Sequence, residues 1–377
     1  MKKLSVLGAA GASGLALALA LAGSATAGHA IASYQSAKLD VSSSSTRLGG
    51  KGTVSIHVSV AATDDATASA TIYVPKGYSA ALSAPSGTQV GTVNAKVAAA
   101  DLAGAILPVT GTITAVDSSA MVTVSGAQIP ITTLATQCTS TPTHAAYLLL
   151  NLSASSQAIQ VPVFVDPAAG AETGFASYKL QLCLGSPYLP AGTPGRATFG
   201  IKLVEATLNL TGVLTNPTAA GPALWSAFLT PWLVGTGAVN TAGTIEIRSA
   251  VLLPVTLKLK GSYNKKKGAA VLAGSLAIGG LADISGIAPF LFSGPKPTKL
   301  KASGRTSKTT KSGAFAVTKK IRKTTYYAVA LATGAGDDTA EVCAGSGTFI
   351  PGVPCVSGTI GGFVVASNIV RVAVPKK

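Results

Sequence analysis

Residues 50–60 read GKGTVSIHVSV, and this stretch decides the class of fold that we expect. Val54, Ile56, Val58 and Val60 alternate with small or polar side chains, so one side of the segment is apolar. Alternation with a period of two is typical of a β-strand that buries one face. Similar apolar runs, separated by Gly, Pro, Asn or Asp, follow at 69–82, 111–126, 145–154, 158–166, 176–185, 197–215 and 243–261. Many short strands spaced in this way are typical of sandwich or barrel folds.

The composition also favours strands over helices. Only 11% of the 377 residues are charged, whereas amphipathic helices need charged side chains on the face that meets water. We therefore expect an all-β protein with two β-sandwich-type domains. Residues 94–106, NAKVAAADLAGAI, are compatible with one short helix, because Ala is the best helix former.

The N-terminal residues have the pattern of a secretory signal. Lys2 and Lys3 precede an apolar Ala- and Leu-rich run, and the small residues Ala25, Thr26 and Ala27 follow it. We expect residues 1–27 to be a signal peptide cleaved after Ala27, and no transmembrane segment in the rest of the chain. The expected location is therefore secreted, or non-covalently associated with a bacterial cell surface.

The four cysteines of an exported chain predict two disulfides. Sequence spacing favours the pairs Cys138–Cys183 and Cys343–Cys355 over crossed pairings. A zinc site is not expected, because no CxxC pair occurs and the three histidines are scattered.

Positive charge is concentrated late in the chain. Residues 258–323 contain fifteen Lys or Arg and one acidic residue, Asp283. The tract GSYNKKKGAA at 261–270 is rich in turn-forming and soluble residues, so we expect it to be a Lys-rich seam. This seam would join a neutral β-rich domain at 28–260 to a basic domain at 271–377.

The C-terminal hundred residues resemble the immunoglobulin-like repeats of bacterial surface and secreted proteins. The matching residues are Gly313, Phe315 and Val317, then Thr325, Tyr327 and Val329, then Val370 and Val372. The segment that carries Cys343 and Cys355 departs from the compact repeat. The resemblance implies a sandwich that serves as a spacer, stalk or adhesive module with no reaction attached. Residues 28–260 resemble no family that we can name.

Residues 303–327, SGRTSKTTKSGAFAVTKKIRKTTYY, are rich in Lys and Arg and have no carboxylate. Such a stretch suits the solvated turns and edges of a sandwich, which we favour, and it also suits a site for anions. The candidate anion contacts are Lys308, Lys311, Lys319, Lys320, Arg322 and Lys323. The expected partner is an anionic cell-wall polymer or a glycan. Export argues against nucleic acid.

Two other clusters leave alternatives open. Trp225 and Trp232 either fill a core, which we favour, or form a platform that stacks on sugar rings as in carbohydrate-binding modules. Asp337, Asp338 and Glu341 are expected to form a solvated turn, with a calcium site as the alternative.

Signs of catalysis are sparse. The mature chain has no Gly-x-Ser-x-Gly motif, and we expect His57 to be a surface residue and His144 a loop residue. Ser262 and Lys265 match Ser-x-x-Lys only by chance, because a Lys-rich tract keeps the amine protonated. We therefore expect no enzyme and no cofactor, and a structural or adhesive role outside the cell. The alternatives are a carbohydrate-binding module and a hydrolase of unrecognised type.

Overall fold

The computed structural model describes residues 34–154, 157–279, 284–333, 339–343, 355–360 and 363–375, with side chains described except over 333–363. Strands dominate these residues, which confirms the all-β prediction. The expected signal peptide with its cleavage site at Ala27 lies outside the described residues. So do Asp337, Asp338 and the side chain of Glu341.

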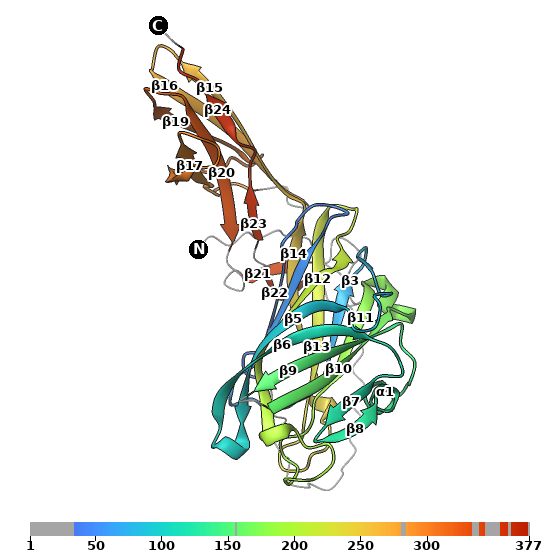
Figure 1. Cartoon of the computed structure of the whole chain (residues 1–377). Helices are drawn as coiled ribbons and strands as arrows, with labels where there is room; N and C mark the ends of the chain where they lie inside the picture. The colour runs from blue at the N-terminus through green and yellow to red at the C-terminus, as the bar shows by residue number, and fades with distance from the viewer. Residues whose placement is uncertain are drawn as a thin grey trace, which may run out of the picture.

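Most strands belong to one large sheet (Figure 1). Its main path runs β1-β2-β12-β5-β6-β9-β10-β11-β3-β13-β14-β22-β21, and β4 pairs with β12. The strands are β1 (Lys38–Ser43), β2 (Lys51–Ser59), β3 (Thr67–Pro75), β4 (Ser79–Ala80), β5 (Gln89–Ala99), β6 (Ala105–Val116), β9 (Ala146–Ala154), β10 (Gln157–Pro167), β11 (Ala176–Cys183), β12 (Ile201–Thr215), β13 (Gly221–Pro231), β14 (Ile245–Leu253), β21 (Thr339–Cys343) and β22 (Cys355–Ile360).

The large sheet curves until it is nearly closed. The Val41 N–H of β1 donates to Ser249 Oγ of β14 at 2.9 Å, although the two residues are 208 positions apart. Along the strands of this sheet whose side chains are described, alternate residues point inward, and their apolar side chains form one core. Ile56, Ile72 and Ile113 are among the fully buried members of this core.

A small hairpin and one helix lie beside the large sheet. The hairpin consists of β7 (Met121–Val124) and β8 (Ala127–Pro130), and helix α1 (Ile131–Thr139) follows directly. Short 3₁₀ turns occur at η1 (Ala100–Leu102), η2 (Gly170–Gly174), η3 (Thr198–Gly200) and η4 (Thr241–Gly243). No helix in the described ranges has the length and apolarity needed to cross a bilayer.

The short helix considered for residues 94–106 is not formed. Strand β5 continues to Ala99, η1 makes the turn, and β6 begins at Ala105. Strand β5 is hydrogen-bonded to β6 on one side and to β12 on the other. Pairing on both edges therefore outweighs the helix propensity of the alanines.

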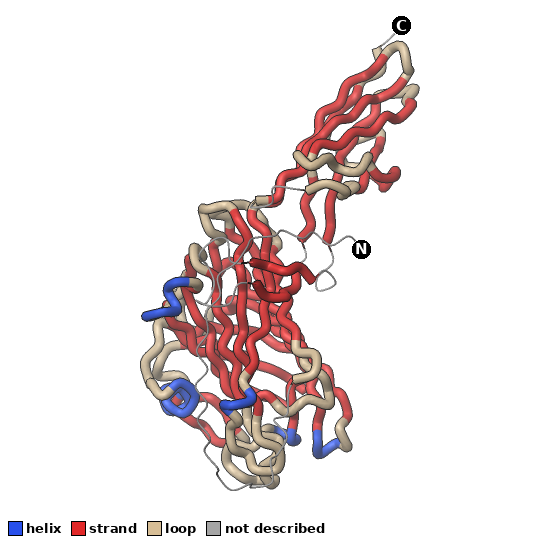
Figure 2. The backbone as a smooth tube through the Cα atoms, turned by 180° about the vertical axis from the view of Figure 1, so that it is seen from behind, coloured by secondary structure: helices blue, strands red, loops and turns tan. Residues whose placement is uncertain are grey.

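Two smaller sheets pack on each other and project from one end of the large sheet (Figures 1 and 2). The first has the order β15-β16-β19, and the second has the order β18-β17-β20-β23 with β24 also paired to β20. Their bounds are β15 (Val255–Asn264), β16 (Ala269–Ile278), β17 (Phe290–Gly294), β18 (Lys301–Arg305), β19 (Ala314–Lys320), β20 (Thr325–Thr333), β23 (Phe363–Ala366) and β24 (Val370–Val372). Leu272 and Phe315 of the first sheet share a core with Leu291 and Val329 of the second.

The tract 261–270, which we expected to be a seam between domains, is part of a β-hairpin. β15 and β16 pair continuously from Val255 opposite Ile278 to Asn264 opposite Ala269. The chain leaves the large sheet earlier, at Leu253, and β15 starts at Val255. Clustered Lys, Asn and Gly suit a hairpin tip as well as a linker, so composition alone does not separate the two.

Candidate functional site

The hairpin tip at 265–268 lies beside the turn that joins β19 to β20. Ala269 of β16 is paired with Lys320 of β19, and the Ile321 N–H donates to the carbonyl of Gly268 at 3.2 Å. Two basic tracts that are more than fifty residues apart in the sequence therefore meet at one end of the smaller sheets.

A third basic turn lies at the same end. Gly294, the last residue of β17, is paired with Tyr326 near the start of β20, so the turn between β17 and β18 is next to the β19–β20 turn. We call the exposed Lys and Arg side chains of these three turns, together with Lys320 at the end of β19, the basic tip. Its members are Lys265, Lys266, Lys267, Lys296, Lys299, Lys320, Arg322 and Lys323.

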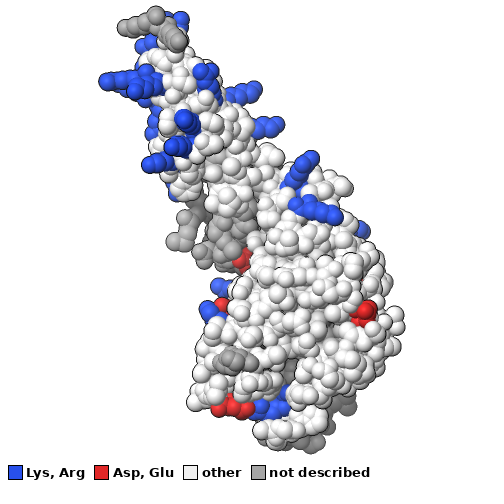
Figure 3. All heavy atoms as spheres, viewed as in Figure 1, with Lys and Arg blue, Asp and Glu red and all other residues white. Residues whose placement is uncertain are grey.

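The charges of the two parts of the chain differ sharply. Residues 28–254 contain nine basic and nine acidic residues. By contrast, residues 255–332 and 364–375 contain no acidic residue among their described side chains. On the face shown in Figure 3, Lys and Arg side chains cover much of the smaller sheets, whereas carboxylates are visible on the large sheet.

Several carboxylates of the large sheet are paired locally. Lys96 lies 2.9 Å from Glu205, and Arg196 lies 2.6 Å from Asp101. Arg248 lies 2.6 Å from Glu246. The cations of the basic tip have no described acidic side chain on their own sheets, so their fields add instead of cancelling.

The structure divides the six candidate anion contacts. Lys320, Arg322 and Lys323 belong to the basic tip. Lys319 is half-buried, and its Nζ donates to the carbonyl of Ser303 at 3.3 Å.

Lys308 and Lys311 are exposed but precede β19, which begins at Ala314, so they lie toward its other end. The remaining members of the tip were missed from the sequence. The KKK run at 265–267 was the available signal, but it was interpreted as a linker.

The two tryptophans do not form a sugar platform. Trp225 is 0% exposed, because alternation along β13 turns Trp225, Ala227 and Leu229 into the core of the large sheet. Trp232 is half-buried and follows the end of β13. The hypothesis that both rings stack on sugars is therefore wrong for Trp225.

The opposite face of β13 carries an aromatic cluster that sequence reasoning did not identify. Tyr73 contacts Phe175 and Phe228, with ring centroids 5.1 and 5.7 Å apart. The Tyr73 hydroxyl donates to Glu172 Oε1 at 2.8 Å, and burial together with this carboxylate raises the pKa of Tyr73. Because both ring pairs are edge-to-face, the cluster is packed within itself and is not a flat platform.

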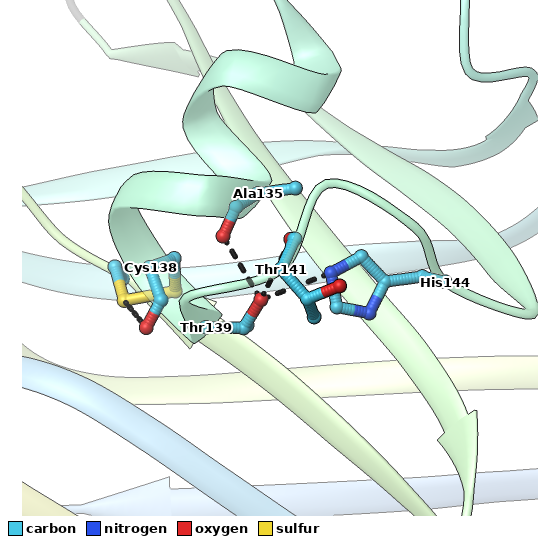
Figure 4. Close-up of a disulfide and its surroundings, with 6 residues drawn as sticks. Ala135, Cys138, Thr139, Thr141 and His144 are labelled. Atoms are coloured by element: carbon cyan, nitrogen blue, oxygen red, sulfur yellow. Dashed lines mark hydrogen bonds between the residues drawn. A yellow bond between two sulfur atoms is a disulfide. The ribbon is translucent and has the colours of Figure 1, made fainter.

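His144 is a loop residue, as expected, but its side chain is completely buried. Its Nδ1 lies 2.7 Å from Asp166 Oδ2, and its Nε2 lies 3.0 Å from Thr139 Oγ1. The ring also stacks on Phe164 with 4.8 Å between centroids. Figure 4 shows the link from His144 to Thr139, next to the disulfide of Cys138.

This hydroxyl–imidazole–carboxylate chain fastens the end of α1 to the large sheet. Thr139 Oγ1 donates within its own helix to the carbonyl of Ala135 at 2.9 Å, which holds the hydroxyl against the backbone. Asp166 also accepts the Ala145 N–H at 3.1 Å. His57 lies on β2 with its Nδ1 2.9 Å from Thr207 Oγ1, and so is engaged with a neighbouring strand. Within the described ranges, no three His, Cys, Asp or Glu side chains gather as a metal-ligand set.

The Cys138–Cys183 disulfide is confirmed, and it joins α1 to β11. β21 and β22 pair with Cys343 directly opposite Cys355. The sulfur atoms of that second pair lie outside the described side chains, so its disulfide stays a prediction.

No protein-family model matches the chain, and comparison with curated proteins finds no similar sequence.

Proposed function

We propose that the protein is an exported, non-enzymatic adhesive protein that attaches to anionic cell-wall polymers through the basic tip. The observation that carries this proposal is the meeting of three basic turns at one end of two sheets whose described side chains include no carboxylate. Exposed cations at this density bind a polyanion by displacing the counterions that surround it, and this binding needs no defined pocket.

Two features of the fold support this function. The three turns are held by strands of two sheets that share one core, so the cations are presented on a rigid support. We further infer that the two smaller sheets, formed by β15 to β20 with β23 and β24, are a separate immunoglobulin-like domain used as a stalk. Phe315, Tyr327 and Val372, which carry the resemblance to immunoglobulin-like repeats, are each at most 4% exposed.

The test compares two variants that lose the same charge from different places. The tip variant combines Lys265→Gln, Lys266→Gln and Lys267→Gln. The matched control combines Lys76→Gln, Lys308→Gln and Lys311→Gln, which are also exposed and lie outside the tip. Binding of each protein to long-chain polyphosphate and to purified cell walls is measured over a range of sodium chloride concentrations.

We expect the tip variant to bind more weakly. The slope of log affinity against log salt is negative, and its magnitude should decrease by about two, because three cations no longer displace counterions from the polymer. The control should change the slope by less than half as much. Equal losses in the two variants would show that net charge, and not the tip, governs binding. Binding that is indifferent to salt and specific for a neutral sugar would support the carbohydrate-binding alternative instead.

A further inference from the structure

A cavity of about 310 Å³ lies on the apolar side of the large sheet. The residues that line it fall between positions 74 and 214 and so precede the residues of the basic tip in the sequence. Core side chains such as Val74, Leu148, Leu180 and Leu210 form its wall. Protein interiors are close-packed and contain few voids larger than a water molecule. A cavity of this size falls at the lower end of the range of small-molecule sites.

Small side chains keep the cavity open. Six alanines line it, at positions 80, 81, 84, 115, 145 and 146. Ala115 lies on β6 and is only 5% exposed, so a larger apolar residue there would project into the cavity. The sequence therefore places the smallest apolar side chain at several positions where Leu or Val would close the space.

One side of the cavity is covered by a segment that is anchored at both ends. Ala80 of β4 pairs with Leu214 of β12, and the Ala81 N–H donates to the carbonyl of Val213 at 2.8 Å. At the other end, the Gly87 N–H donates to the carbonyl of Ala115 at 2.8 Å. Between these anchors, Leu82 and Ala84 line the cavity, so residues 80–87 form a strap across it.

Polar groups meet the cavity along another part of its wall. Asp117 and Ser118, after β6, are exposed, and so is Thr143 in the loop before β9. Hydrogen bonds from Ser119 to the Asp117 carboxylate lower the pKa of Asp117, so this group is ionised at neutral pH. The described residues that line the cavity include no Lys or Arg.

We propose that this cavity binds a small apolar molecule whose polar end is not anionic. The apolar wall takes the body of the ligand, and Ser118 and Thr143 face its polar end. The ligand has about twelve non-hydrogen atoms, since a cavity of roughly half this volume holds one benzene ring. A carboxylate or phosphate at the polar end is disfavoured, because it would meet Asp117 without a compensating cation.

The experiment uses two ligands of nearly equal size and different charge, 2-naphthylmethanol and 2-naphthoate, titrated into the full-length protein by calorimetry. We expect saturable 1:1 binding of the neutral alcohol and binding of the anion that is about tenfold weaker. Absence of saturable binding of the alcohol, or equal affinities for the two ligands, would overturn the proposal.

Two variants locate the binding. Ala115→Leu fills the cavity from β6, and Ala84→Leu fills it from the strap. We expect both variants to fold with an unchanged or higher melting temperature and to bind the alcohol about tenfold more weakly. Ala277→Leu, which adds the same side chain to the exposed face of β16, should leave the affinity unchanged.

If both filling variants retain wild-type affinity, the ligand binds elsewhere. If both variants lower the melting temperature sharply, the cavity does not have room for the added leucine side chains. Either result contradicts the proposal. Polymer binding through the basic tip should be unaffected by these substitutions, so the two proposals stand or fall separately.

Discussion

Removing the disulfide between Cys138 and Cys183 should destabilise the large sheet strongly without abolishing its fold. The bond closes a loop between residues 45 positions apart and attaches the last turn of α1 to the end of β11. In the chain-entropy model, a cross-link of this span removes conformational entropy from the unfolded chain and thereby raises its free energy by roughly 4 kcal/mol at 25 °C. That is a large part of the roughly 5–15 kcal/mol that stabilises a typical domain.

The fold itself should survive in the variant Cys138→Ala/Cys183→Ala. Helix α1 keeps Ile131 and Ala135 buried, and the chain from Thr139 through His144 to Asp166 still ties its end to β10. The near-ultraviolet circular dichroism spectrum should therefore remain native-like.

Unfolding by urea, followed by tryptophan fluorescence, measures the effect. Both tryptophans belong to the part of the chain that ends before Leu253, so the signal reports on the large sheet. We expect the free energy of unfolding to fall by roughly 4 kcal/mol. The comparison variant Cys343→Ala/Cys355→Ala removes the other expected bond, which spans 12 positions and would contribute roughly 3 kcal/mol.

A loss below about 1 kcal/mol in the first variant, or a larger loss in the second than in the first, would refute this reasoning. In that case the covalent link would add little to what the His144 network and the packing of α1 already fix. A mass spectrum of the intact protein before and after reduction would show at the same time whether the second bond exists.

Two further predictions concern the core of the large sheet and Tyr34, which precedes its first strand. Trp225→Ala should cost about 3–5 kcal/mol of unfolding free energy because the ring is fully buried, whereas Trp232→Phe should cost less than about 1.5 kcal/mol; urea titrations compare them. Burial, assisted by Asp64 and Asp65, raises the pKa of Tyr34 to about 12, so the folded protein holds this proton more tightly than the unfolded chain does. The contribution of this proton to the free energy of unfolding is complete below about pH 10 and is lost as the pH rises toward 12. Measured as the free energy of unfolding against pH, the profile of Tyr34→Phe should be flatter in this range.

The strands were predictable because their signal is local. In residues 50–60 the alternation of Val54, Ile56 and Val58 with polar residues is a direct consequence of strand geometry, and β2 covers Lys51–Ser59 with these three side chains buried. A pattern of period two needs only a face to be buried, whatever that face packs against. The sheet order, in which β2 lies between β1 and β12, depends on distant partners and was not predictable in this way.

Helix α1 shows the opposite situation. Its sequence ITTLATQCT is rich in β-branched residues, and no side chain caps its start at Pro130. Helix propensity therefore does not indicate it. Tertiary contacts hold it in place: Ile131 and Ala135 are buried, and Cys138 is bonded to β11.

The candidate site was half predictable for a similar reason. The basic character of Lys320, Arg322 and Lys323 is visible in the sequence, and the end of β19 with the turn after it places them in solvent. Their position beside the run at 265–267 follows from the register of β16 against β19, which depends on pairing between residues about fifty positions apart. Composition does not show which residues of two strands are paired. From the sequence, the lysines at 265–267 are therefore interpreted as a linker.

The division of charge between the two parts of the chain bears on how the protein would sit on a polymer. Residues 28–254 carry equal numbers of basic and acidic residues, so the large sheet adds little to a long-range attraction. Almost all of the attraction then acts on the smaller sheets, and a charge that is concentrated at one end orients a protein in an external field. Contact through the basic tip would leave the large sheet, with its cavity, directed away from the polymer, because the smaller sheets project from the large sheet's end (Figure 1).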